Sequence, residues 1–232
     1  MPPKLSLVLP VHHQADHIAG VVRGFAAALE RLEISYEIIL VPNGSADDDR
    51  ACRELGQELP SVCCRPSEGQ GWGRAVRAGI AGTQGELICF ANSARTQADD
   101  LSRIVGAGLA SKGAVVKALR VTRHSVVRRA ASGAFNLLCN GLLDVRTADV
   151  NGTPKVFPRT AVGLLNLSSD DDLLDLEFMW RCRRDNLPVI EIDVRSDQRH
   201  GGRSTTNLGT ATKLCAGAIR FWRRTRAESL GR

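Results

Sequence analysis

Two hydrophobic patterns alternate along the first hundred residues. Short, nearly continuous apolar runs that stop at a turn-forming residue are typical of strands buried in a parallel sheet. Between them lie stretches whose apolar residues recur every three or four positions, which indicates amphipathic helices. The strand-like runs are residues 5–9, 36–41, 62–65 and 86–90. The helix-like stretches are residues 18–32, 46–57 and 73–82, with Asp16 predicted to cap the first of them.

The second half of the chain is less regular. Its predicted elements are a helix at 99–110, a strand at 114–118, a basic segment at 120–129 that enters a helix ending near 143, a turn and short strand at 149–157, a helix at 173–184, a strand at 188–194, and a C-terminal helix after a loop at 195–203. No repeat, linker or break in composition divides the chain. We therefore expect one domain, in which residues 1–206 form the main body and residues 207–232 add a basic amphipathic helix.

Alternation of strands and helices predicts an α/β fold with a mostly parallel central sheet flanked by helices. In such sheets, ligands bind beyond the carboxyl ends of the strands. Three loops follow predicted strands at that edge: residues 12–14, 42–45 and 92–95. These loops are the first candidates for a binding site.

Composition narrows the kind of ligand. The chain has 232 residues, of which 43% are hydrophobic, and we expect it to stay in the cytoplasm because no apolar run reaches the ~20 residues of a membrane span. The net charge is +6, and 26 of the 31 basic residues are arginine, which suits recognition of phosphates. Phosphorylated small molecules and an anionic membrane surface are therefore favoured partners. Nucleic acid is not expected, because the ten aromatic residues form no stacking platform between basic residues.

Six segments resemble family 2 glycosyltransferases. Leu7–Gln14 is similar to the opening strand and Pro-Val-Tyr-Asn-Glu signature of that family, 38–47 to its Val-Asp-Asp-Gly-Ser-x-Asp segment, and 71–86 to its glycine-bearing helix. Residues 149–157, 175–178 and 199–204 look like the branch that makes polyprenyl-phosphate sugars. The resemblance implies a GT-A-type nucleotide-diphospho-sugar transferase fold. It also implies transfer of a sugar, with inversion, from a nucleotide-diphosphate sugar to an acceptor, here a polyprenyl phosphate.

Three acidic positions of the family are neutral in this chain. Gln14 stands where the family has Glu, Pro42-Asn43 where it has Asp-Asp, and Asn92-Ser93-Ala94 where it has Asp-x-Asp. In the family the Asp-x-Asp pair brings Mg²⁺ or Mn²⁺ to the donor diphosphate. Because these carboxylates are missing, we predict no metal ligands and no cofactor, and we expect arginines to stabilise the leaving diphosphate instead.

The resemblance also implies three sets of site residues. The donor would contact Pro10, Val11, His12, Gln14, Asn43, Gly71, Asn92, Ser93, Ala94 and Arg95. The acceptor phosphate would contact Arg120, Arg129, Lys155, Arg199, Arg203 and Ser204. The catalytic residues would be Asp149, Glu177, Arg199 and Arg203.

Each assignment has a structural alternative. Any one arginine can be a solvated surface residue, Asp149 can simply form a turn, and Glu177 can lie on a helix surface. The acidic run 169–172 precedes a helix and is interpreted as its N-terminal cap. The basic C-terminal helix fits either an anionic membrane or its own domain.

A rival function is a catalytically silent glycosyltransferase-like protein that binds a nucleotide or partner. A nucleotidyltransferase on a similar sheet is a weaker alternative, since it too needs clustered carboxylates.

The seven cysteines are scattered without a C-x-x-C motif, and we expect reduced thiols.

Overall fold

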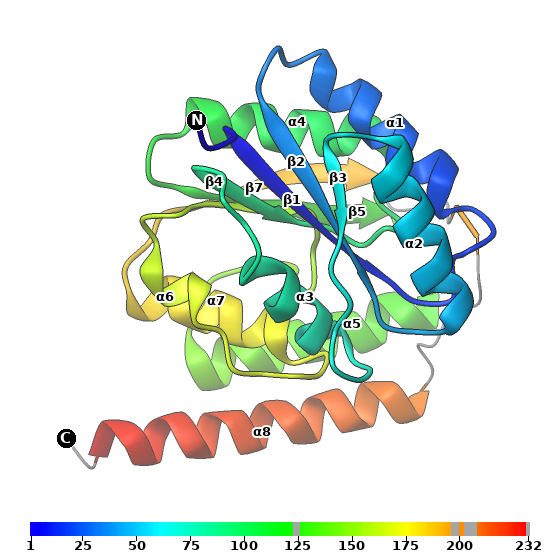
Figure 1. Ribbon diagram of the computed structural model, residues 1–232. Helices are drawn as coiled ribbons and strands as arrows, with labels where there is room; N and C mark the ends of the chain where they lie inside the picture. Colours follow the sequence, from blue (N-terminus) through cyan, green and yellow to red (C-terminus); the bar gives the residue numbers. More distant parts are fainter. Residues whose placement is uncertain (123–125, 196–199, 202–207, 231–232) are drawn as a thin grey trace.

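The computed structural model describes residues 1–122, 126–195, 200–201 and 208–230 (Figure 1). One sheet holds the strands β1 (Leu5–Val11), β2 (Tyr36–Pro42), β3 (Val62–Cys64), β4 (Leu87–Phe90), β5 (Val115–Thr122), β6 (Lys155–Pro158) and β7 (Val189–Arg195). The helices are α1 (Ile18–Glu30), α2 (Ala46–Glu58), α3 (Trp72–Ile80), α4 (Ala98–Ala110), α5 (Val126–Leu143), α6 (Val162–Leu165), α7 (Leu174–Arg184) and α8 (Leu208–Leu230).

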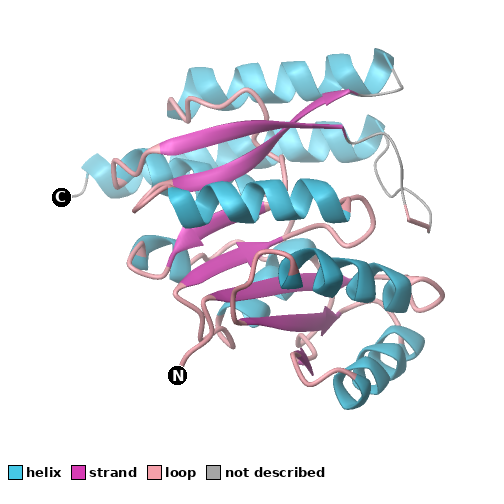
Figure 2. Ribbon diagram, turned by 90° about the horizontal axis from the view of Figure 1, so that it is seen from above, coloured by secondary structure: helices cyan, strands magenta, loops and turns pink. Residues whose placement is uncertain are grey.

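Helices cover both faces of the sheet (Figure 2). Helices α1, α2 and α4 contribute to one hydrophobic cluster, together with the β1 side chains Leu5, Leu7 and Leu9. Helices α3, α5, α6, α7 and α8 contribute to the other cluster, where Val8 of β1 points. All seven residues of β1 are buried, which explains why this strand has no polar–apolar alternation.

The strand order is β3-β2-β1-β4-β6-β5-β7, and every pair is parallel except those that involve β6. Strand β6 begins at Lys155, which pairs with Phe90 at the carboxyl end of β4. The preceding segment therefore returns the chain to that edge, and β6 has to run back in the opposite direction. The expected α/β fold with a mostly parallel sheet is confirmed.

Two predicted details near the helix ends are wrong. Asp16 does not cap α1, because its carboxylate contacts the His17 ring (2.6 Å) and no side chain caps that helix. Strand β5 extends to Thr122, so Arg120 lies on a strand and not in a segment entering a helix. The basic residue Arg120 near the end of this strand was misinterpreted as the start of a basic segment outside the strand.

Helix α8 packs along α5 and places Ala218 and Phe221 in the core (Figure 1). Its basic side chains remain exposed on the other side. Among the described residues, no helix is both long and apolar enough to cross a membrane.

Candidate functional site

Loops from β1, β2 and β4 meet at the carboxyl edge of the sheet. The fully buried Asp48, in the first turn of α2, joins the first two loops. Its carboxylate accepts the backbone N–H of His13 and of Gln14 (both 2.7 Å) and also contacts Ser45, with which it forms a capping box. Burial raises the pKa of Asp48, but these hydrogen bonds outweigh it and hold the pKa below its ordinary value.

Two amide side chains at this edge are only partly satisfied. The Asn43 Nδ2 donates to the carbonyl of Gly71 (3.0 Å), while its Oδ1 is buried and receives no hydrogen bond from the described residues. Gln14 is 5% exposed, and its Oε1 likewise has none. Buried acceptors without a donor are costly, so these oxygens are suited to a ligand that supplies N–H or O–H groups.

The other predicted donor residues line the same loops. Pro10 and Val11 end β1, and the His12 Nδ1 lies 3.4 Å from the carbonyl oxygen of Asn43. Gly71 immediately precedes α3 with φ of 128°, a conformation that favours glycine. A Cβ at Gly71 would lie 2.5 Å from the carbonyl oxygen of Asp170, so this position also requires glycine for space.

Internal hydrogen bonds hold the loop Asn92-Ser93-Ala94. The Asn92 Oδ1 accepts the backbone N–H of Ala94 (3.0 Å), and the Ser93 hydroxyl donates to the carbonyl of Pro10 (2.6 Å). His200 closes over the loop, with its backbone N–H on Ala94 O (3.0 Å) and its ring on Thr96 O (2.6 Å).

This loop does not fit the Mg²⁺ or Mn²⁺ implied by the family. The Asn92 oxygen is already used, Ala94 has no ligand atom, and a divalent cation prefers several carboxylate oxygens. Within the described ranges, no three His, Cys, Asp or Glu side chains converge as a metal site. We therefore derive no catalytic step through a metal.

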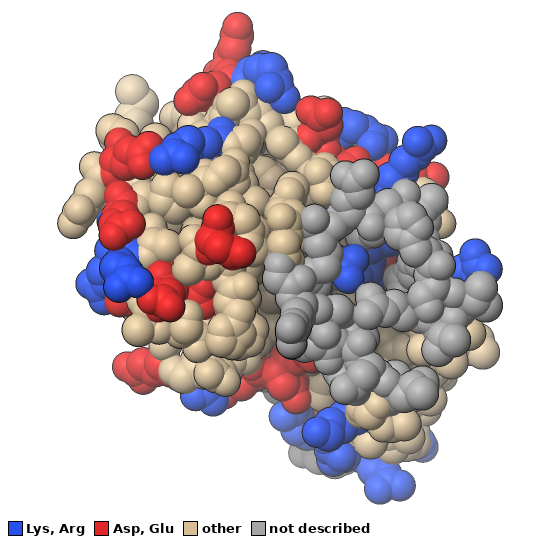
Figure 3. Space-filling model, turned by 90° about the vertical axis from the view of Figure 1, so that its right-hand side faces the viewer, with Lys and Arg blue, Asp and Glu red and all other residues tan. Residues whose placement is uncertain are grey.

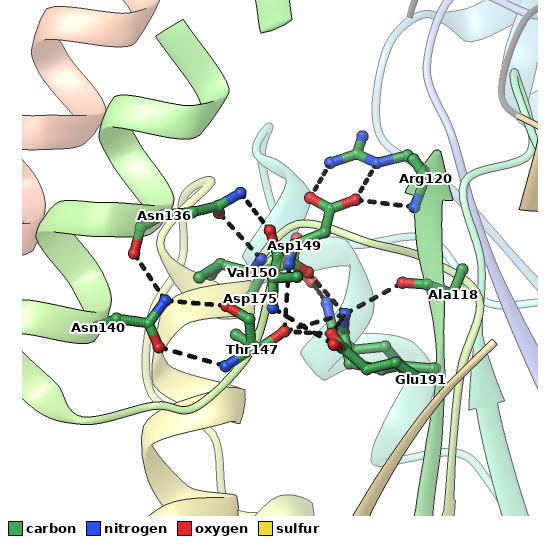
Figure 4. Close-up of polar contacts among 12 residues, drawn as sticks. Ala118, Arg120, Asn136, Asn140, Thr147, Asp149, Val150, Asp175 and Glu191 are labelled. Carbon is green, nitrogen blue, oxygen red and sulfur yellow. Dashed lines mark hydrogen bonds and ion pairs between the residues drawn. The ribbon is translucent and has the colours of Figure 1, made fainter. Parts of the chain in front are cut away.

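A second polar cluster lies where the end of β5 meets residues 147–150 (Figure 4). Arg120 forms a bidentate ion pair with Asp149, with Nε–Oδ2 at 2.6 Å and Nη2–Oδ1 at 2.7 Å. Asp149 is 2% exposed, and its carbonyl accepts the Nζ of the buried Lys117 (2.6 Å). The predicted acceptor arginine and the predicted catalytic acid thus neutralise each other.

Sequence reasoning missed the support of this cluster. Lys117 also pairs with Glu191 (2.9 Å), whose Oε1 accepts the Thr147 hydroxyl (2.5 Å). Burial raises the pKa of Glu191, but the Lys117 ammonium and the Thr147 hydroxyl hold it below its ordinary value. A lysine in the middle of an apolar strand was the available signal, because a buried ammonium requires a partner.

Lys155, a predicted contact of the acceptor phosphate, lies on a strand and not in a loop. It is fully buried at the start of β6, forms an ion pair with Asp175, and lies 5.4 Å from the Phe90 ring centroid. Burial lowers the pKa of Lys155, and the Asp175 carboxylate opposes that shift. Asp175 also accepts the indole N–H of Trp72 (3.0 Å), so this pair holds α7 against α3.

Glu177 is buried among several hydrogen-bond donors. It is 1% exposed and accepts the backbone N–H groups of Ser168 (2.9 Å) and Ser169 (2.7 Å), as well as the Arg181 guanidinium (2.6 Å). Burial raises its pKa, but these donors outweigh that effect and keep the pKa below the ordinary value. The surface alternative is therefore wrong, and the catalytic assignment of Glu177 stays a prediction.

The acidic run after residue 168 serves two helices. Asp171 accepts the backbone N–H of Leu173 (3.0 Å), the residue before α7, but no side chain caps that helix, so the predicted N-terminal cap is wrong. Asp170 instead forms ion pairs with Arg74 and Arg77 of α3. Its carbonyl accepts the backbone N–H of Arg74 (3.0 Å), so this run fixes the start of α3 beside Asn43.

The remaining predicted cations have varied positions. Arg95 is half-buried next to the replaced motif, and Arg129 is exposed on α5. Arg199, Arg203 and Ser204 lie outside the described residues.

A sheet of this topology, with its ligand-facing loops at the carboxyl edge, defines a GT-A-type fold, and solved structures agree. Glucosyl-3-phosphoglycerate synthase from Mycobacterium tuberculosis, in complex with Mn²⁺, uridine diphosphate and phosphoglyceric acid, matches with a TM-score of 0.70 at 19% identity, over 94% of this chain and 76% of that one. Its complex with Mn²⁺, uridine diphosphate and glucosyl-3-phosphoglycerate matches with a TM-score of 0.68. At this identity the likeness shows the fold alone.

Residues 6–106 match the family described as glycosyl transferase family 2, and the resemblance to that family is confirmed. The undecaprenyl-phosphate 4-deoxy-4-formamido-L-arabinose transferase of Sodalis glossinidius is 27% identical over 210 residues, 88% of this chain and 63% of that protein. The protein of the same name from Klebsiella pneumoniae is 31% identical over 210 residues, 87% of this chain and 62% of that protein. This chain thus spans about three fifths of the length of these relatives.

Proposed function

We propose that this chain transfers a sugar from a nucleotide-diphosphate sugar to a polyprenyl phosphate. The donor half is supported by two buried oxygens, Gln14 Oε1 and Asn43 Oδ1, that have no hydrogen-bond partner among the described residues. They lie at the carboxyl edge of the sheet, where ligands of parallel α/β sheets bind. The acceptor class is supported by the relatives, whose names describe transfer to undecaprenyl phosphate.

The chemistry asks little of a general base. A phosphate monoester acceptor is an anion at neutral pH, so its oxygen attacks the anomeric carbon directly while the bond from that carbon to the diphosphate oxygen breaks. The nucleoside diphosphate leaves with the electron pair. The protein therefore mainly has to position the two substrates. A general base is not needed, which agrees with the ion pairs that Asp149 forms with Arg120 and Glu177 forms with Arg181.

Positive charge near the leaving group has to come from the protein. We propose that Arg95 contributes it, because this half-buried residue directly follows the replaced motif at the carboxyl edge of the sheet. The donor site then operates without a tightly bound divalent cation.

The test measures release of nucleoside diphosphate from a panel of nucleotide sugars with a short-chain polyprenyl phosphate, with and without a chelator. We expect turnover that resists the chelator, and a roughly 10- to 100-fold lower rate for Arg95→Ala. Loss of turnover with the chelator would contradict metal independence. Nucleotide binding without any turnover would instead support a catalytically silent binding protein.

A further inference from the structure

Helix α8 has one face fixed against the domain. Ala218 and Phe221 are buried, and the Phe221 ring meets Trp180 edge-on at 5.5 Å. A Cβ at Gly217 would lie 2.6 Å from a methyl carbon of Leu173, so the helix backbone approaches α7 closely. This contact fixes which side of α8 faces outward.

The outward side forms a basic face, which consists of Lys213, Arg220, Arg223, Arg224 and Arg226, all exposed. Glu228 is the sole acidic residue in the sequence of α8, so the helix carries +4 of the chain's net charge of +6. Figure 3 shows Lys and Arg atoms gathered at the lower end of the molecule, where Figure 1 places α8.

This face differs from other basic surfaces of the protein. Arg23, Arg50 and Arg53 on α1 and α2 each pair with a carboxylate. In the described part of the chain, no carboxylate pairs with Lys213, Arg220 or Arg223. The α8 basic face is therefore a concentrated, uncompensated positive charge, which attracts a polyanionic surface.

The side chains favour lipid over nucleic acid. The aromatic residues of α8 are unavailable for base stacking, since Phe221 is buried and Trp222 packs against the core. One exposed aliphatic side chain, Ile219, lies between these cations in the sequence of α8. A basic helix that also exposes an aliphatic side chain suits the headgroup region of an anionic bilayer.

We propose that the α8 basic face docks this protein on an anionic lipid bilayer. This inference rests on the proposed function in one respect: a lipid-linked acceptor gives the protein a reason to dock on a membrane. Docking itself requires neither donor nor turnover.

The test is sedimentation of the protein with phosphatidylcholine vesicles that contain or lack phosphatidylglycerol. The variant combines Lys213→Gln, Arg220→Gln and Arg223→Gln. The control combines Arg23→Gln, Arg50→Gln and Arg53→Gln, which removes the same charge from the opposite face of the sheet. Circular dichroism establishes that both variants are folded.

Binding is expected to anionic vesicles alone and to weaken as salt rises. The α8 variant should bind on the order of 100-fold more weakly, since each basic residue near an anionic surface contributes about 1 kcal/mol. The control should bind like the parent.

Equal losses in the two variants, or equal binding to neutral vesicles, would overturn the proposal, as would preferential binding to double-stranded DNA through the same residues. The two proposals can fail separately. Vesicle binding without turnover would contradict the proposed function but support docking. Turnover of a soluble short-chain acceptor without vesicle binding would support the proposed function but contradict docking.

Discussion

The buried carboxylates of this protein organise loops through several donors at once. Asp48 connects the loops after β1 and β2, and Glu177 holds residues 168 and 169 against α7. The carboxylate oxygens of both residues accept hydrogen bonds from the loops and side chains around them. Their influence on function is therefore exerted through the position of the backbone.

A prediction for stability follows from the lowered pKa of Glu177. A carboxyl group whose pKa is lower in the folded than in the unfolded chain stabilises the fold above the unfolded value, about 4.3, and loses that contribution as the pH falls through the folded pKa. Glu177→Gln should lower the free energy of unfolding at neutral pH by about 3 kcal/mol, because it leaves Arg181 unpaired. Its stability should also change less than the parent's between neutral pH and about pH 3.

Urea unfolding at several pH values measures both effects. Glu58→Gln serves as the control, because Glu58 forms an exposed ion pair with Arg23 and should cost little. Parallel pH curves for Glu177→Gln and the parent would show that Glu177 does not carry this dependence.

The sequence predicted which residues belong to this region but not what they do. Asp149 and Glu177 were identified through resemblance, and both prove to be buried. Their partners, Arg120 and Arg181, lie on neighbouring elements or one helical turn away, and a single sequence does not state which cation meets which carboxylate. The burial of Lys155 was not predictable for the same reason, because its partner Asp175 is 20 residues away in the sequence.

At the scale of elements, the start of α3 is the most constrained feature of the candidate site. A Cβ at Gly73 would lie 2.7 Å from the carbonyl oxygen of Asp171 and would also meet that of Ser169. We expect Gly73→Ala to destabilise the fold by about 2 kcal/mol through overpacking, and to weaken nucleotide binding because it shifts Gly71 away from Asn43.

Gly20→Ala is the matched control on α1, where nothing lies within 4 Å of an added Cβ. It should stabilise the protein by roughly 0.5–1 kcal/mol, because alanine is the better helix former. Thermal unfolding and nucleotide titration measure both variants. A Gly73→Ala protein as stable as Gly20→Ala would contradict the close contact with residues 169–171.

Most elements were predictable because hydrophobic periodicity is a local property. Strands β1, β2 and β4 and helices α1, α2 and α4 begin and end within a few residues of their predicted limits. The direction of β6 was not predictable in this way, since it depends on where residues 144–154 travel before the strand begins. The end of β5 was missed because Arg120 is a polar residue whose place on the strand depends on its ion pair with Asp149.

At the scale of the whole molecule, α8 and the sheet share one hydrophobic cluster. We therefore expect residues 1–206 and 207–232 to unfold together, and Phe221→Ala to cost about 3–5 kcal/mol. Tryptophan fluorescence and far-ultraviolet circular dichroism should give coincident urea transitions for the parent and the variant. A separate early transition of α8, with the remainder unaffected, would contradict the single domain.

The internal hydrogen bonding of the Asn92-Ser93-Ala94 loop bears on how this site evolves. Ala94 is 4% exposed, so an aspartate there would place a carboxylate in a buried position, while the Asn92 oxygen stays committed to the backbone. A single Ala94→Asp substitution should therefore destabilise the fold without creating a cation site. Metal binding at this loop would require more than one substitution to arise together.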